Sequence, residues 1–237
     1  MKNILILLLS AFIFQANAQN CNDGFYPFYE GASWITTSYT AKGVPTNVEN
    51  YKIKNVTTGT NSLSAQVFAT IFDSKGKDTS VVDYTMSCVN GVVKINMENI
   101  MSSQLKNNPQ MQNMELKMVG EDLEFPSSLA VGQTLPDSKL KVEMYNAGTL
   151  FATMNIVATS RTVVAKESIT TAAGTFECYK VTTTFNMEMM MMNIPIKNSF
   201  SSTEWISKGV GVVKSESYDK GGKMLSYNLL TKAPVKK

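Results

Sequence analysis

The chain has 237 residues, a formal net charge of +3 and no histidine. So small a charge provides no electrostatic basis for binding nucleic acid. Without histidine the chain has no Ser-His-Asp triad, no His-bound zinc site and no imidazole base. Only 17% of the residues are charged, which suits an exported β-protein better than a cytosolic helical one.

The first eighteen residues have the features of a secretory signal peptide. Lys2 provides the positive charge, residues 4–14 the apolar segment, and Ala-Asn-Ala at 16–18 a cleavage site. The apolar segment is too short to span a bilayer, and no later run is long enough. We therefore expect an exported domain over residues 19–237, periplasmic or secreted, without a transmembrane segment.

Three cysteines remain after such a cleavage, at Cys21, Cys88 and Cys178. Gln19 and Asn20 precede Cys21 where a lipoprotein signal has small residues, so we expect no lipid anchor. In an oxidising compartment two of the three cysteines can pair. The strand-like contexts of Cys88 and Cys178 favour a disulfide between these two. The sequence does not fix the pairing, however, and free buried thiols would pack as small apolar groups.

Apolar and polar residues alternate along most of the chain, which predicts half-buried β-strands. From residue 63 to 71 the apolar residues occupy the odd positions, and at 139–144 they alternate with charged residues. Lys-Gly pairs at 42–43, 75–76 and 220–221 each separate two strand-like arms. Glycine allows the positive φ of tight hairpin turns. Because helices between the strands are missing, we predict a mainly β fold with antiparallel pairing.

Residues 98–119 interrupt this pattern. They are polar and rich in methionine, and Pro109 breaks them. Residues 100–105 fit one short helix, while the spacing from Met111 to Met118 fits either a helix or a strand. We predict an excursion with a short helix that covers or flanks one opening of the sheet. Such excursions are often functional or mobile, but an ordinary surface crossover fits equally well.

Four segments in this order resemble a known family: "GFYPFYEGASWITTSYTAKG", "DLEFPSSLAVGQTLPDSKL", "AGTFECYKV" and "EWISKGVGVVKSESYDKGGKMLSYNLLTK". The resemblance is to the TapB-like proteins, a domain-of-unknown-function group of exported β-proteins from Gram-negative envelopes. It implies a single antiparallel, strongly curved sheet, either a half-barrel or an open barrel, similar to periplasmic lipoprotein carriers. It implies no activity, because no catalytic motif is established for that group.

The motifs that could carry catalysis are weak. The pattern S-x-x-K occurs four times, which indicates chance because the accompanying S-D-N and K-T-G elements are missing. Glu167, Glu177, Glu188 and Glu204 lie in alternating strands, where exposed charges are normal. We therefore expect no enzyme and assign no cofactor.

The segment 185–200, "FNMEMMMMNIPIKNSF", holds Met187 and four consecutive methionines at 189–192. Thioethers are soft ligands that suit Cu(I). The apolar residues, however, move from odd to even positions within the run. A β-bulge is the usual cause of such a change of face, and flexible methionines would fill it. We favour this packing interpretation, while an apolar ligand surface and a copper site stay open.

The functional prediction is a non-catalytic envelope binding or carrier module for a lipid or another apolar or amphipathic molecule. One alternative is a structural or assembly protein of the envelope with a filled core, and another is a Cu(I)-binding protein that uses the methionines. No metal ligands are assigned, and the sequence identifies no protein partner. The residues predicted to contact the ligand are Met187, Met189, Met190, Met191, Met192, Phe200 and Trp205.

Overall fold

The computed structural model describes residues 21–106, 111, 114–192 and 194–235. The expected signal peptide, residues 1–18, lies outside this part. The elements in chain order are η1 (Cys21–Asp23), β1 (Ser33–Thr40), β2 (Pro45–Gly59), β3 (Ser62–Asp73), β4 (Asp78–Val89), β5 (Val92–Ile95), α1 (Met97–Lys106), β6 (Glu115–Gly120), β7 (Leu123–Pro126), β8 (Ser138–Asn146), β9 (Thr149–Thr171), β10 (Gly174–Met191), β11 (Ile194–Ser207), β12 (Gly211–Asp219) and β13 (Met224–Lys232).

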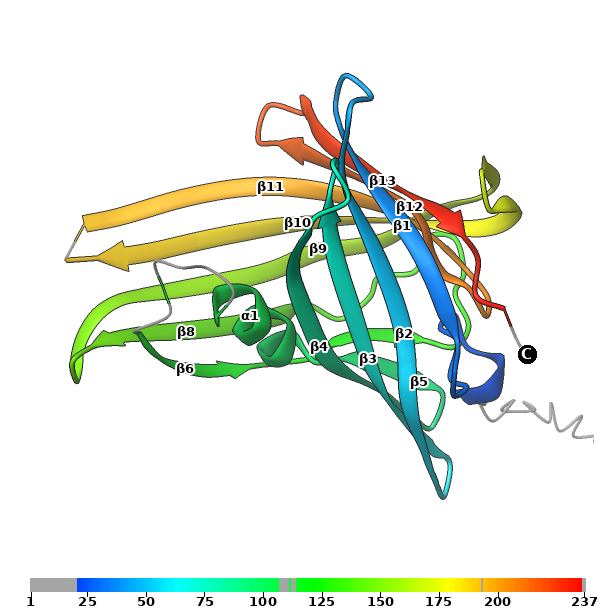
Figure 1. The fold of residues 1–237 in the computed structure, drawn as a ribbon, viewed down its shortest axis with the longest axis horizontal. Helices are drawn as coiled ribbons and strands as arrows, with labels where there is room; N and C mark the ends of the chain where they lie inside the picture. Colours follow the sequence, from blue (N-terminus) through cyan, green and yellow to red (C-terminus); the bar gives the residue numbers. More distant parts are fainter. Residues whose placement is uncertain (1–20, 107–110, 112–113, 193, 236–237) are drawn as a thin grey trace, which may run out of the picture.

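All thirteen of these strands belong to one antiparallel sheet. Their order is β6-β8-β9-β10-β11-β12-β13-β1-β2-β3-β4-β5-β7. In the described residues β6 and β7 are the two ends of the sheet and do not pair with each other, so the sheet is open. Figure 1 shows that it is strongly curved, because β8–β11 run away from β1–β5 at a steep angle. The prediction of a mainly β fold with a single antiparallel, open sheet is confirmed.

We call the part of the sheet that projects sideways the arm. It consists of β6 and β8 together with residues 149–158 of β9, 185–191 of β10 and 194–199 of β11. The remaining strands form a curved wall. The arm and the wall share one continuous concave face, because β9, β10 and β11 run through both.

The predicted alternation places the expected residues in the interior. In β3 the odd positions from Leu63 to Ala69 are buried, and in β8 Leu140, Val142 and Met144 are buried. The three Lys-Gly tips lie in the turns of the hairpins β1–β2, β3–β4 and β12–β13. Local sequence therefore determines these strands and turns.

The excursion contains both a helix and an edge strand. Asn96 caps α1, because its side-chain oxygen accepts a hydrogen bond from the backbone N–H of Asn99 at 2.8 Å. Glu98 accepts another from the backbone N–H of Gly120, also at 2.8 Å, which ties α1 to β6. The helix lies between β4 and the arm (Figure 1). No helix in the described ranges has the length and apolar character to cross a membrane.

Two hydrophobic cores lie along the sheet. The main core belongs to the wall and contains residues such as Phe25, Ile53, Val67 and Leu230. The second core belongs to the arm, where α1 packs on the sheet through Met97, Met101 and Leu105. Its buried centre consists of Leu140, Val142, Met144, Ala152 and Met154.

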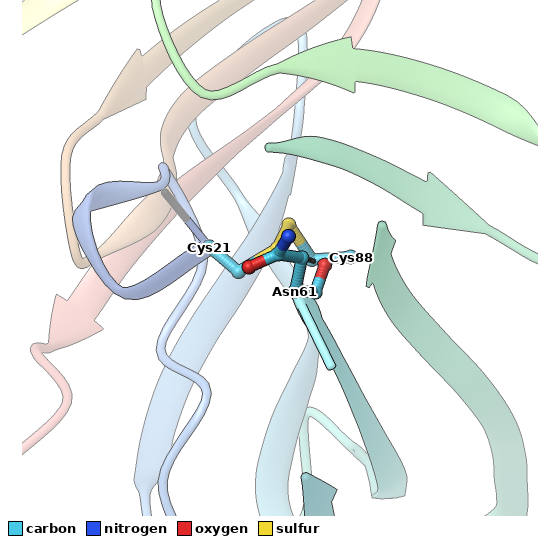
Figure 2. Close-up of a disulfide and its surroundings, with 3 residues drawn as sticks. All are labelled: Cys21, Asn61 and Cys88. Carbon is cyan, nitrogen blue, oxygen red and sulfur yellow. Dashed lines mark hydrogen bonds between the residues drawn. A yellow bond between two sulfur atoms is a disulfide. The ribbon is translucent and has the colours of Figure 1, made fainter. Parts of the chain in front are cut away.

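The disulfide joins Cys21 to Cys88, with a Cα–Cα distance of 5.7 Å (Figure 2). The predicted Cys88–Cys178 pairing is wrong, because six strands separate β4 from β10 in the sheet. The N-terminal segment instead crosses the end of β4, where Cys21 also lies close to Asn61. Cys178 is a free, buried thiol, and burial raises its pKa to about 11.

Candidate functional site

The methionine run forms the end of the β10–β11 hairpin. Met191 lies opposite Ile194, and the pairing from Phe185 to Met191 shows no register shift. The predicted β-bulge is therefore wrong. The apolar positions change from odd to even because Met191 pairs with Ile194, so that odd residues of β10 lie opposite even residues of β11.

The hairpin sorts the methionines onto two faces, because directly opposite residues point to the same side. Met187, Met189 and Met191 lie on the concave face and pack against the second core. Met190 lies on the other face and is 37% exposed, and Met192 lies in the turn and is 72% exposed. The predicted ligand residues are thus not all brought together.

The second core contains an unusual proportion of methionine. Ten of the fifteen methionines belong to it or pack against it: Met97, Met101, Met111, Met114, Met118, Met144, Met154, Met187, Met189 and Met191. Methionine side chains are unbranched and adapt to irregular gaps. The interface between α1 and the arm therefore has a core that can repack.

Phe200 and Trp205 point to opposite sides of β11. Phe200 stacks on Phe185, with 4.9 Å between the ring centroids, on the same face as Met187. Trp205 lies on the other side, where the ammonium groups of Lys180 and Lys214 lie 5.0 and 4.5 Å from its ring. Of the two residues, only Phe200 can line the concave face.

A pocket of about 280 Å³ lies on the concave face of the wall. We call it the inner pocket. Side chains from the middle of the sheet order, from β5 and β7 at one of its ends and from the N-terminal segment line it, and Ile95, Leu123 and Val212 are among its apolar residues. Its aromatic and acidic lining residues are Tyr26, Trp34, Glu49, Tyr51, Tyr84 and Glu204.

Glu49 lines one side of the inner pocket and is held in place by hydrogen bonds. Its carboxylate accepts hydrogen bonds from the hydroxyls of Tyr51 at 2.5 Å and of Thr36 and Ser38 at 3.3 Å each. Tyr51 stacks on Trp34 with 5.0 Å between ring centroids and an interplanar angle of 1°. Burial, together with the Glu49 carboxylate, raises the pKa of Tyr51 well above its usual value, so the phenol stays neutral.

Glu204 enters the same pocket from β11. Within the described part of the chain, no group donates a hydrogen bond to its carboxylate, and burial raises its pKa. The expectation that Glu204 is an ordinary exposed strand carboxylate is therefore wrong. The alternation along β11 could have predicted its position, because Glu204 is even-numbered like Phe200 and Ile196, which lie on the concave face.

The positive charge of Arg161 acts on Glu204 and partly offsets the rise in its pKa. Arg161 is 1% exposed. Its Nη atoms donate to the backbone oxygens of Pro136 at 2.6 Å and Glu124 at 3.1 Å, and its guanidinium lies 4.7 Å from the Phe125 ring centroid. Arg161 is thus held by main-chain oxygens and does not line the pocket, although its charge acts on the lining residues Glu204 and Tyr26.

The arm has two further hollows. One, of about 390 Å³, is lined by residues of the β8–β9 and β10–β11 turns, including Leu150, Met190 and Met192. The other, of about 650 Å³, lies beside β11 and includes Met187, Lys197 and Lys220 among its lining residues. Neither combines stacked aromatic rings with a carboxylate that lacks a donor, so the inner pocket is the stronger candidate site.

Comparisons with known proteins identify the family. A DUF3108-like family description matches residues 29–230. A candidate lipoprotein from Parabacteroides distasonis has a similar structure, with a TM-score of 0.70, 24% identity, and coverage of 89% of this chain and 98% of that one. A candidate exported protein with a YmcC-like fold from Bacteroides fragilis gives a TM-score of 0.66, 24% identity, and coverage of 91% and 100%.

At these identities the two structures show a shared fold alone. No curated protein sequence matches the chain. The family match, by contrast, spans both the wall and the arm. The chain therefore belongs to the DUF3108-like family.

Proposed function

We propose that the protein is a non-catalytic binding or carrier module of the cell envelope that holds an amphipathic molecule on the concave face of its curved sheet. The observation that carries this proposal is the inner pocket. It combines an apolar, aromatic lining with a few convergent polar groups, which is the usual character of a small-molecule site.

The two cores suggest how a ligand with a polar head and an apolar tail would lie. Met97, the first residue of α1, lines the inner pocket and also packs against the second core. A head in the inner pocket would therefore place its tail next to Met187, Met189, Met191 and Phe200. Methionine-rich surfaces repack around varied apolar partners, so α1 can accommodate a tail by rearranging side chains.

An envelope location is supported by the signal-like residues 1–18 and by the descriptions of the structural neighbours as a candidate lipoprotein and a candidate exported protein. We propose export without a lipid anchor, because the Cys21 sulfur that a lipid would modify is engaged in the disulfide. Closer kinship with the TapB-like proteins stays a prediction.

Blocking the inner pocket tests the proposal. The probe is N-phenylnaphthylamine, a dye whose fluorescence rises in apolar surroundings. Val212→Trp places a large ring in the pocket, whereas Val119→Trp places the same ring on β6 at a position that is 75% exposed. We expect the pocket variant to weaken dye binding about tenfold, or about 1.4 kcal/mol, and the control to leave it unchanged.

Near-ultraviolet circular dichroism shows whether each variant keeps its tertiary packing. A folded wild-type protein that binds no dye, or equal binding by the two variants, would contradict the proposal.

One observation favours the structural alternative. β12 pairs with β11 only from Phe200 onward, so residues 194–199 of β11 have no further strand partner in the described sheet. Ile194 and Ile196 on this edge are 61% and 44% exposed. Unpaired apolar edges are sites of strand addition. Crosslinking of an envelope protein through Lys197, together with no bound small molecule, would favour an assembly role.

A further inference from the structure

We propose that the inner pocket recognises an ammonium headgroup. This inference rests on the proposed function, since it names the polar end of the same amphipathic ligand. It follows from the charge of the lining, from its aromatic rings and from the missing partner of Glu204.

The inner pocket is acidic. Two carboxylates, Glu49 and Glu204, reach it from β2 and β11, and none of the described residues that line it is Lys or Arg. A phosphate or carboxylate headgroup would meet like charges in a poorly solvated site, which is unfavourable. The charge of the lining therefore selects a cation.

The aromatic lining also suits a cation. Trp34 and the three tyrosines at 26, 51 and 84 surround the same space. Burial raises the pKa of each of these tyrosines, so all three rings stay neutral and electron-rich at physiological pH. A cation over an aromatic face gains about 0.5–2 kcal/mol, and cages of Trp and Tyr are how proteins bind alkylated ammonium groups.

Within the described ranges, Glu204 lacks a hydrogen-bond partner when the pocket holds no ligand. Glu49 already accepts three hydrogen bonds, whereas the Glu204 carboxylate has no donor among the described residues. A desolvated carboxylate without a partner is costly. Arg161 offsets this cost only in part, because its Nη atoms donate to backbone carbonyls and not to the Glu204 carboxylate. An ammonium group bound in the pocket would supply the counter-charge.

The test compares three amphiphiles with the same twelve-carbon tail. Dodecyltrimethylammonium carries the cation, dodecyl maltoside a neutral head and dodecanoate an anion. Each is titrated below its critical micelle concentration into the full exported protein by isothermal calorimetry. We expect the ammonium compound to bind at least about tenfold more tightly than either of the others. Tetramethylammonium should compete with it, while sodium at equal ionic strength should not.

Two matched variants assign the preference to Glu204. Glu204→Gln keeps the shape of the side chain and removes the charge, and should reduce the preference for the cation about tenfold. Glu188→Gln makes the same change beside Lys197, where the side chain is 47% exposed, and should change nothing. A preference that survives Glu204→Gln would overturn the inference.

The outcomes separate this inference from the proposed function. If the three amphiphiles bind equally, or if dodecanoate binds best, the headgroup assignment is wrong and the binding role stands. If none of them binds to the folded protein, the proposed function is wrong and the headgroup assignment falls with it.

Discussion

At the scale of single residues, the site depends on which side of β11 each side chain takes. Glu204 and Trp205 are neighbours in the chain but lie on opposite faces of the sheet. Glu204 enters the inner pocket, whereas Trp205 lies between two lysines and donates from Nε1 to Glu167 at 2.6 Å. Trp205, which the sequence suggests as a ligand contact, is thus part of the packing, whereas the neighbouring Glu204 lines the pocket.

Glu204→Gln is expected to stabilise the protein at neutral pH without ligand. Burial raises the pKa of Glu204 in the folded state above its unfolded value. The folded state therefore binds the proton more tightly, and stability falls as the pH rises through the folded pKa. Removing the charge should raise the free energy of unfolding by about 1–2 kcal/mol at pH 7.5 and have almost no effect near pH 4.

Urea denaturation at the two pH values measures this difference. Glu188→Gln, which removes an exposed pair with Lys197, should stay within about 0.5 kcal/mol of wild type at both. Loss of stability at pH 7.5 in Glu204→Gln would contradict the position assigned to this carboxylate.

At the scale of elements, the sequence predicts what depends on neighbouring residues. The alternation in β3 and β8 and the Lys-Gly turns identify strands and hairpins, because side-chain direction and turn conformation are local properties. The Cys21–Cys88 pairing was missed because it depends on which strand end the N-terminal segment crosses. The bulge was predicted in place of a hairpin turn because both change the parity of an apolar run.

The disulfide gives an element-scale prediction, since it fastens the N-terminal segment to β4 across 67 residues. Replacing Cys21 and Cys88 together by Ala should lower the free energy of unfolding by about 2–4 kcal/mol. Alkylation of unreduced, denatured wild-type protein should label Cys178 alone, and peptide mapping should recover the 21–88 link. A label on Cys21 would contradict this pairing.

The methionines around the second core give a second prediction at this scale. Met97, Met101, Met187, Met189 and Met191 pack against this core without being fully buried. Changing all five to Leu should cost less than about 1.5 kcal/mol per site, since the volume is nearly conserved. Fewer tail lengths of alkyltrimethylammonium compounds should then bind tightly, because a Leu side chain adjusts its shape to a ligand less readily than a Met side chain.

Calorimetry with tails of ten to sixteen carbons measures the range of tail lengths that bind tightly. Met190→Leu with Met192→Leu is the control, as both side chains lie away from the second core. An unchanged range in the fivefold variant would show that the tail does not lie against the second core.

At the scale of the whole molecule, the open sheet creates a site that no single segment of sequence reveals. The inner pocket draws its aromatic and acidic groups from the N-terminal segment, β1, β2, β4 and β11, which come together only when the sheet curves. A period of two identifies the two faces of a strand but not which face becomes concave. The family match extends over the wall and the arm together, so both parts belong to the unit on which the proposed function rests.

The most direct test of the central claim is native mass spectrometry of the protein after export to an oxidising periplasm, compared with its denatured mass. We expect the native mass to exceed the denatured mass by that of an amphipathic molecule, which denaturation releases. The Val212→Trp variant should lack this excess mass, whereas the Val119→Trp variant should keep it. A native mass equal to that of the bare chain would contradict the binding role, and an excess equal to copper would assign the methionines to a metal instead.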